Sequence, residues 1–299
     1  MSLKIVFMGT PEFAVPCLEL LKKSGHEIQC VYSQPPSKAN RGQKLVSPAV
    51  EIYAKKYSLK LRNPINLDTD EEYNFLSQTK PDLVVVVAYG KIIPKRFLKL
   101  PKHSFINVHA SLLPKWRGAA PIQRSIMNLD KETGISIMKI VERLDEGPIL
   151  LQNKIRINEN ISSLSLSKVL SKLGAKSLIN SIDLIEKGEA KYTEQNNEEA
   201  TYAKKISKSE SQIIWNDKAE KILAKINGLN PNPGAWFEYN NQRYKVWKAK
   251  VINESGEVGK IINDKLIFYC KDKSIQILEI QKEGKIKQSS EKFLVGNKL

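Results

Sequence analysis

The sequence has little of what membrane-spanning or exported chains carry. Its longest purely apolar run, residues 83–88, is far shorter than the roughly 20 residues that a membrane helix needs. The first residues are too few for the core of a signal peptide, and no small-residue cleavage site follows them. We therefore expect them to form the first strand of the fold, in a cytoplasmic protein with no membrane partner.

Cysteine and histidine are also scarce, with three of each in 299 residues. Cys17, Cys30 and Cys270 match neither a CxxC motif nor the spacing of zinc ligands, so no metal site is expected. A sparse, odd number of cysteines favours a reducing compartment. We predict that the three thiols are small buried side chains with a structural role.

Basic residues dominate the charge, with 48 basic against 32 acidic side chains and a net charge of +16. Such an excess favours a polyanionic partner, either nucleic acid or a membrane surface. A general bias toward lysine would raise the charge without any binding role. Residues 206–299 carry 17 basic and 11 acidic side chains, a net +6, so the positive charge is spread along the chain.

Apolar runs alternate with helical patterns through the first half of the chain. Thr10 is expected to cap the first helix, Pro11 to occupy its first position and Gly25 to end it. This alternation predicts an α/β domain with a Rossmann-like open parallel sheet. The expected strands are 3–8, 28–32, 83–88, 104–109 and 135–141, and a long amphipathic helix is expected at 164–187.

The chain becomes polar near residue 188, and short strands follow. We interpret residues 189–206 as a linker between two domains. Beyond it, hairpin-sized turns separate short apolar runs, which is typical of a small β-barrel. A helix is expected at 217–226 and strands at 235–239, 243–252, 266–270 and 274–281.

One histidine differs from the other two. His26 and His103 are most simply surface residues, whereas His109 ends an apolar strand. Alternation along that strand places Asn107 on the same face, roughly 6.6 Å away. Ligands of open parallel sheets bind beyond the carboxyl ends of the strands. An amide donor and an imidazole at such an end can serve as an oxyanion and proton-transfer pair.

A carboxylate follows on a Gly/Pro turn at residues 143–148. Taken alone, this is more often an ordinary turn. Together with Asn107 and His109, Asp145 completes a set of an amide, an acid or base, and an orienting carboxylate. A dinucleotide site is excluded after the first strand, because the G-x-G-x-x-G spacing is absent and Pro11 occupies the flexible second position.

The segment Asn-Val-His-Ala-Ser-Leu-Leu-Pro at residues 107–114, with Asp145 after it, resembles the signature of the folate-dependent formyltransferases. Residues 114–123 resemble the branch of that family that acts on methionyl-tRNA. Segments 7–14, 41–45 and 87–94 fit the same branch. The likeness covers the whole chain and weakens after about residue 206. One departure is Ala110, where many relatives have glycine.

The resemblance implies transfer of the formyl group of 10-formyltetrahydrofolate to the α-amino group of methionine on initiator tRNA. It makes residues 1–188 the catalytic domain, 189–206 a linker and 207–299 an OB-like tRNA-binding domain, in a monomeric protein. Backbone near residues 88–93 would face the pterin. The implied catalytic residues are Asn107, His109 and Asp145, and those lining the folate pocket are Ser111, Leu112, Leu113 and Pro114.

Two basic segments are candidates for contact with tRNA. The loop at residues 34–44 carries Lys38, Arg41 and Lys44, and in the resembled family an insertion here enters the acceptor end of the tRNA. Arg41 can contact bases or phosphates in bidentate fashion. The second segment lies in the strand at 243–252, where alternation pairs Arg243 with Lys245 on one face and Lys248 with Lys250 on another.

Two other functions stay open on the sequence alone. A formyltransferase acting on a small amine, such as a purine-precursor ribonucleotide or an amino sugar, would use the same chemistry. The run at residues 115–118, the basic loop and a basic C-terminal domain argue against it. A non-enzymatic RNA-binding protein built on an inactive formyltransferase fold is disfavoured, because all three catalytic candidates are present.

Overall fold

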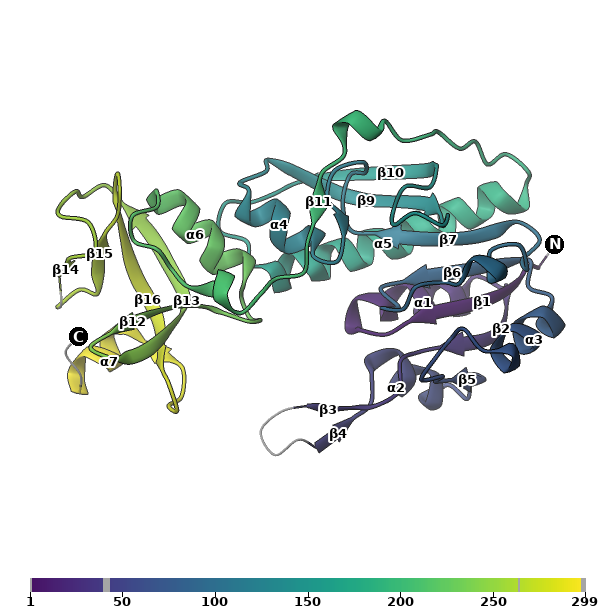
Figure 1. The fold of residues 1–299 in the computed structure, drawn as a ribbon, viewed down its shortest axis with the longest axis horizontal. Coiled ribbons are helices and arrows are strands. Elements are labelled where there is room, and N and C mark those ends of the chain that lie inside the picture. The colour runs from purple at the N-terminus through teal and green to yellow at the C-terminus, as the bar shows by residue number, and fades with distance from the viewer. Residues whose placement is uncertain (1, 40–43, 263, 297–299) are drawn as a thin grey trace. The chain divides into compact units, whose positions relative to one another are not determined.

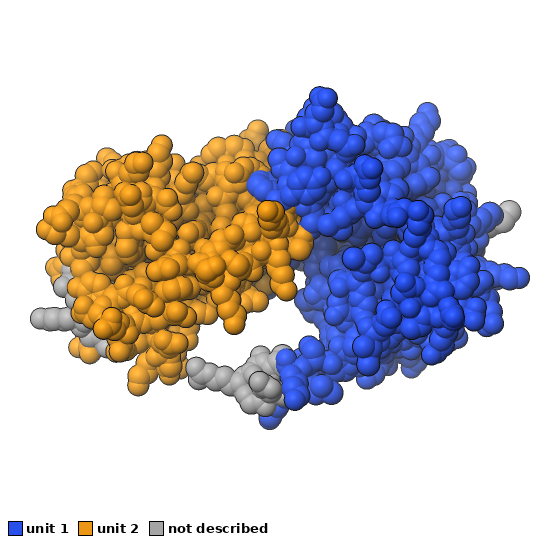
Figure 2. Space-filling model, viewed as in Figure 1, with its two compact units in different colours: residues 1–118, 134–155, 167–202 blue, residues 119–133, 156–166, 203–299 orange. Residues whose placement is uncertain are grey.

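The computed structural model describes residues 2–39, 44–262 and 264–296. Its chain forms two compact units, coloured separately in Figure 2. The first comprises residues 1–118, 134–155 and 167–202, and the second residues 119–133, 156–166 and 203–299. Each unit therefore contains chain segments that are far apart in sequence. Among the described residues, no helix is both long and apolar enough to cross a membrane.

A seven-stranded sheet forms the centre of the first unit, in the order β10-β9-β7-β6-β1-β2-β5 (Figure 1). The five strands from β7 to β5 are parallel, which confirms the predicted α/β class. Strand β9 runs antiparallel to β7, so the sheet is mixed. Its strands are β1 (Lys4–Gly9), β2 (Glu27–Tyr32), β5 (Leu61–Arg62), β6 (Leu83–Val87), β7 (Ser104–His109), β9 (Glu132–Lys139) and β10 (Ile149–Arg156).

Further helices and short strands lie wholly or partly in the first unit. Helix α5 packs on β7 and β9 through Gly174, where an added Cβ would lie 2.9 Å from Val108. Strands β3 and β4 form a separate two-stranded hairpin. These elements are η1 (Glu12–Ala14), α1 (Val15–Lys23), β3 (Ser37–Ala39), β4 (Lys44–Val46), α2 (Ala49–Lys56), α3 (Asp70–Thr79), η2 (Lys95–Phe97), β8 (Arg117–Gly118), α5 (Ser163–Glu186), η3 (Asn197–Glu199) and β11 (Tyr202–Ala203).

The first helix begins differently from the sequence expectation. Pro11 is the N-cap of η1 and no side chain caps that helix. The hydroxyl of Thr10 instead donates to the carbonyl oxygen of Tyr89 at 2.7 Å. Thr10 follows β1 and Tyr89 follows β6, so this hydrogen bond joins the carboxyl ends of two neighbouring parallel strands.

The second unit contains an antiparallel half-barrel, which confirms the predicted small β-domain. Its strands follow the order β12-β13-β16-β15-β14, with β17 paired to β16. Helices α4 and α6 belong to the same unit, and Gly228 of α6 lies so close to α4 that an added Cβ would be 2.8 Å from Met127. The elements are α4 (Pro121–Met127), η4 (Ser209–Ser211), α6 (Ala219–Gly228), β12 (Ala235–Tyr239), β13 (Gln242–Ile252), β14 (Ile261–Ile262), β15 (Ile267–Tyr269), β16 (Ser274–Lys282), β17 (Gln288–Ser289) and α7 (Ser290–Gly296).

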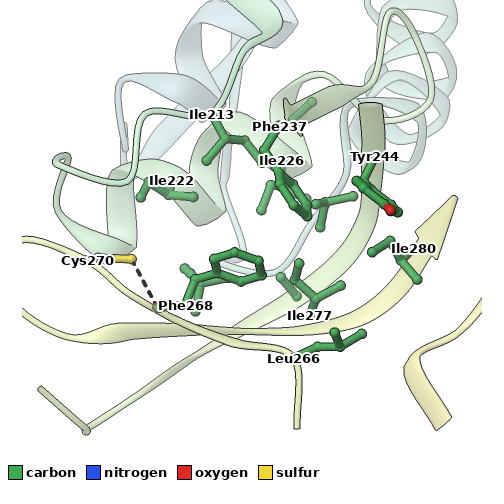
Figure 3. Packing of buried hydrophobic residues seen from close by; sticks show 14 of the residues in the cluster. Ile213, Ile222, Ile226, Phe237, Tyr244, Leu266, Phe268, Cys270, Ile277 and Ile280 are labelled. Carbon is green, nitrogen blue, oxygen red and sulfur yellow. Dashed lines mark hydrogen bonds between the residues drawn. The ribbon is translucent and has the colours of Figure 1, made fainter. Parts of the chain in front are cut away.

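Aromatic and branched aliphatic side chains fill the core of the half-barrel (Figure 3). Trp215 stacks on Phe268 with ring centroids 4.1 Å apart, and Phe237 packs edge-on to both rings. Tyr244 is buried in the same core. Trp236 and Trp247 are half-buried outside it.

The three cysteines are buried and unpaired, as predicted. Burial raises the pKa of each of the thiols of Cys17, Cys30 and Cys270 to about 12. The thiols are therefore small apolar core groups at neutral pH and not nucleophiles.

Candidate active site

Three parallel strands bring their carboxyl ends to one edge of the sheet. They are β1, β6 and β7, which end at Gly9, Val87 and His109. The chain order reverses between β1 and β6, and open α/β sheets bind their ligands at such a switch point. Asn107 and His109 both lie on β7 and are two residues apart, so they project to the same face at this edge.

The imidazole of His109 lies between two acceptors and is 6% exposed. Its Nε2 is 3.0 Å from the carbonyl oxygen of Trp116, and its Nδ1 is 3.6 Å from Oδ2 of Asp145. The first distance is that of a hydrogen bond, whereas the second is a charge contact. Since a carbonyl oxygen only accepts, Nε2 carries a proton, and both nitrogens can donate only in the imidazolium form.

The carboxylate of Asp145 is held by backbone. Its Oδ2 accepts a hydrogen bond from the amide of Gly118 at 2.8 Å, and its side chain is only 11% exposed. Asp145 has a φ of 53°, in the left-handed region that costs energy for a residue with a Cβ. The predicted grouping of His109 with Asp145 is thus present, with Asn107 two residues earlier on the same strand.

Around Asp145, several residues form a network that the sequence did not reveal. The guanidinium of Arg117 is 1% exposed and donates to the side chains of Gln195 and Asn197. The sequence singled out Arg117 only as one residue of the run at 115–118, which favoured a tRNA substrate. Because Arg117 is buried, it cannot make a surface contact. Gln195 lies in the polar stretch at 189–206, where nothing in the sequence distinguishes it.

The segment predicted to line a folate pocket turns sharply after β7. Ser111 is fully buried, and its hydroxyl donates to the carbonyl oxygen of Lys115 at 2.6 Å. Leu113 is also buried, and its amide donates to the hydroxyl of Ser136 at 3.0 Å. Leu112 and Pro114 are half-buried, and the Leu113–Pro114 peptide is cis. The side chains of Ser111 and Leu113 therefore shape the turn, while those of Leu112 and Pro114 are partly exposed.

A second loop lies beside this turn, after β6. Ala88 and Gly90 are exposed and have φ values of 46° and 80°, while Tyr89 between them is buried. The side-chain amide of Gln34 donates to the carbonyl oxygen of Tyr89 at 3.0 Å. The φ of Gly90 lies in the left-handed region, which favours glycine, and an added Cβ would also have to displace the Gln34 amide.

The predicted tRNA loop at residues 34–44 is partly strand, because β3 and the first residue of β4 lie within it. Lys38 of β3 and Lys44 of β4 are both exposed, and their strands pair in antiparallel fashion. Leu45 is also exposed, at 70%. Arg41 lies outside the described residues. The two described cations are thus presented at the surface on a short hairpin.

One group of potential metal ligands occurs in the described part of the chain. His26, Asp183 and Glu186 bring their ligand atoms within 4.8 Å of one another. Nδ1 of His26 already accepts the amide of Leu3 at 3.3 Å. The group lies near the start of β2 and the end of α5, and contains none of the residues predicted for the site.

Residues 3–182 match the formyl transferase family, and residues 205–298 match the C-terminal domain of formyl transferases. The chain therefore belongs to the formyl transferase family. It is 50% identical to the methionyl-tRNA formyltransferase of Pelagibacter ubique strain HTCC1062, over all of this chain and 97% of that protein.

Solved structures show the same fold at lower identity. One is an N-formyltransferase from Helicobacter canadensis bound to folinic acid and dTDP-3-aminofucose, with a TM-score of 0.69 and 21% identity, over 93% of this chain and 99% of that one. Another is a methionyl-tRNA formyltransferase from Clostridium thermocellum, with a TM-score of 0.58 and 18% identity, over 92% of this chain and 98% of that one.

Proposed function

We propose that the protein transfers the formyl group of 10-formyltetrahydrofolate to the methionine α-amino group of initiator methionyl-tRNA, for translation initiation. The observation that carries this proposal is the 50% identity to a methionyl-tRNA formyltransferase along the whole chain, C-terminal unit included. His109 contacts Asp145 and lies two residues after Asn107 on the same strand, and this grouping supports the chemistry.

The edge of the sheet fits a folate. Exposed backbone at Ala88 and Gly90 offers peptide donors and acceptors to a flat ring, and half-buried Leu112 and Pro114 offer an apolar wall. Both segments follow neighbouring strands, β6 and β7. We propose Ser111 to Pro114 as the folate-lining segment, with Ser111 and Leu113 acting through the shape of the turn. Bound there, the folate supplies the formyl group.

The catalytic roles follow from the donors and acceptors that the chain provides. As the amine attacks the formyl carbon, negative charge grows on the formyl oxygen, and the side-chain amide of Asn107 can donate to it. His109 in its imidazolium form is a second donor. Asp145 keeps the ring of His109 oriented, and its carboxylate can accept the proton that the amine loses while the imidazolium donates to the formyl oxygen.

For the polyanionic substrate, two surfaces are proposed. Lys38 and Lys44 of the β3–β4 hairpin, and Arg41 between them in the sequence, would contact the acceptor end of the tRNA. The C-terminal domain, residues 207–299 of the second unit, would contact tRNA phosphates beyond the acceptor end. We also propose that the protein acts as a cytoplasmic monomer that needs no metal ion.

The deciding experiment compares amine acceptors. The purified protein is given 10-formyltetrahydrofolate with charged initiator methionyl-tRNA, glycinamide ribonucleotide or a dTDP-linked amino sugar. Release of tetrahydrofolate and the mass of the formylated product are measured. We expect turnover with the charged tRNA and at most trace turnover with the small amines. Preferred use of a small amine would refute the assigned substrate, and no turnover with any acceptor would refute the enzyme.

A further inference from the structure

The loop at residues 143–147 depends on surrounding contacts for its exact geometry, because one of its residues lies in a backbone region that costs energy for a side chain with a Cβ. Asp145 has a positive φ, although it is not a glycine. Gly147 packs so tightly against β9 that an added Cβ would be 1.9 Å from the carbonyl oxygen of Lys139. Strain of this kind persists only where surrounding contacts over-determine it.

A single side-chain amide provides two of these contacts. Nε2 of Gln195 donates to the carbonyl oxygen of Asp145 at 2.8 Å and to that of Gly147 at 2.7 Å. Gln195 thereby bridges the backbone on both sides of Glu146. Since the carboxylate of Asp145 projects from one of the bridged residues, this bridge fixes where that carboxylate can lie.

The orientation of the amide is set by a buried cation. Oε1 of Gln195 accepts from Nε and Nη2 of Arg117, at 3.1 and 2.8 Å. A guanidinium only donates and the two backbone carbonyls only accept, so the amide has one satisfied orientation. Nη2 of Arg117 also donates to Oδ1 of Asn197 at 2.8 Å, which holds the segment that carries Gln195.

The charge of Arg117 is balanced within the same loop. Its Nη1 lies 3.4 Å from Oε1 of Glu146. An almost fully buried cation requires such a partner. Glu146 takes this part, so the carboxylate of Asp145 is left to face His109.

We propose that Arg117 and Gln195 are positioning residues for the reaction: they hold the 143–147 loop so that the carboxylate of Asp145 stays against His109. The proposal rests on the function proposed above and adds to it a residue, Gln195, from the polar segment between the two family matches. Neither residue needs to touch a substrate for this role.

The principal test replaces Gln195 without changing its size. Gln195→Glu keeps an acceptor for Arg117 but sets a carboxylate oxygen against the carbonyls of Asp145 and Gly147. Misplacement of a reacting group by about 1 Å can cost up to about 100-fold in rate. We expect kcat to fall on the order of 10- to 100-fold, while KM for the folate changes less than about twofold. Glu194→Gln is the matched control. Glu194 is the exposed neighbour of Gln195, and this variant makes the reverse exchange of amide and carboxylate, so wild-type kcat is expected.

A double-mutant cycle separates positioning from general loss of structure. If Gln195 acts through Asp145, then Gln195→Glu in an Asp145→Asn protein should lower kcat by less than about twofold, because the group that it positions is already gone. Losses that multiply in full would overturn the proposal. So would a wild-type kcat in Gln195→Glu.

Further variants keep the test decisive if the introduced charge impairs folding. Gln195→Met removes the donor without adding charge, and Arg117→Lys keeps the charge but loses the fork that holds the amide. Both should show the same fall in kcat at unchanged KM. All rates are given as ratios to wild type, measured with whichever amine the wild type uses. A wrong tRNA assignment would change which amine is used, whereas a wrong positioning role would change only these ratios.

Discussion

The amide of Gly118 donates a hydrogen bond to the carboxylate of Asp145 across 27 positions of sequence, at 2.8 Å. This contact ties the turn after β7 to the loop after β9. It leaves the same oxygen, Oδ2, 3.6 Å from the imidazole of His109. Both contacts use the Asp145 side chain, so only a substitution that keeps an acceptor for Gly118, such as Asp145→Asn, reports on the His109 contact separately.

Substitution of Asn107 should affect the chemical step alone. Removal of one oxyanion donor costs on the order of 10² to 10³ in rate, so Asn107→Ala should lower kcat by that factor. Its binding of folate should survive. The measurements are single-turnover formylation and folate affinity by fluorescence or calorimetry. A properly folded Asn107→Ala protein with near-wild-type turnover would remove the residue from the mechanism.

His109→Ala should lose at least as much activity as Asn107→Ala, since the imidazole has both a donor and a proton-transfer role.

Asp145→Asn keeps an acceptor for the Gly118 amide but removes the negative charge. Because general acid–base groups contribute roughly 10² to 10⁴ in rate, kcat should fall by a factor in that range. The measurement is a pH–rate profile for each variant. A profile for His109→Ala with wild-type shape would count against proton transfer through this ring.

Cations near the β3–β4 hairpin should matter for tRNA only. Arg41→Ala, and the pair Lys38→Gln with Lys44→Gln, remove charge from the proposed acceptor-end contact. We expect lower kcat/KM for methionyl-tRNA and a folate affinity within about twofold of wild type. Both quantities are measured on the same preparations. Equal losses in tRNA and folate binding would assign these side chains to the fold or the folate pocket instead.

The second unit should contribute the salt dependence of tRNA binding. Arg243, Lys248 and Lys250 are exposed on β13, whereas Lys245 donates to the carbonyl oxygen of Pro233. Replacement of the three exposed cations by Gln should weaken binding and flatten the plot of log K against log salt, by up to about one unit per lost phosphate contact.

The matched control removes three cations from α5: Lys168, Lys172 and Lys176, which are exposed at four-residue spacing. It makes the same change in net charge elsewhere, so its slope should stay close to wild type. Identical slopes in both triple variants and wild type would mean that β13 does not meet tRNA. Truncation after residue 205 is a poorer test, because it would strip α4 of its contact with α6.

The buried thiols predict a dependence on alkaline pH. Burial raises the pKa of Cys17 to about 12, well above its value in an unfolded chain, so the native state retains the proton longer. The stability from this neutral thiol is present below about pH 9 and is lost as pH rises toward 12. Between pH 8 and 10, the free energy of unfolding should fall less steeply in Cys17→Ala than in wild type. An alkylating reagent at pH 8 should label three cysteines only after unfolding.

Much of the architecture was predictable, because it depends on local periodicity. The valine run of β6, the strand that ends at His109 and the long helix α5 all lie within one or two residues of the expected bounds. The direction of β9 was not predictable, since an antiparallel neighbour has the same local pattern as a parallel one. Thr10 has the chemistry of a cap, and its hydroxyl instead bonds across the sheet.

The faces of β13 show why alternation alone fails. It places Arg243 and Lys245 opposite Lys248 and Lys250, but the pairing with β16 slips beside Lys248. Buried positions accordingly change from Tyr244 and Val246 before the slip to Ala249 after it. A β-bulge inserts one residue and shifts the alternation, so all four cations share the outer face.

Site residues were predictable only where their residue type and position together indicated a chemical role. Asn107, His109 and Asp145 are residue types with few roles at a strand end or turn. Gln195 is an amide in a stretch rich in amides, and its importance depends on partners 48 and 50 positions away. Long-range hydrogen bonds of this kind leave no periodic trace in a sequence.

The discontinuous composition of the second unit has a practical consequence for protein engineering. That unit is assembled from residues 119–133, 156–166 and 203–299, so the chain crosses between the units five times, after residues 118, 133, 155, 166 and 202. A chimera made at one junction near residue 203 would import a half-barrel without the α4 segment against which its α6 packs. Functional exchange of C-terminal units between relatives should therefore require the 119–133 and 156–166 segments to travel with the half-barrel.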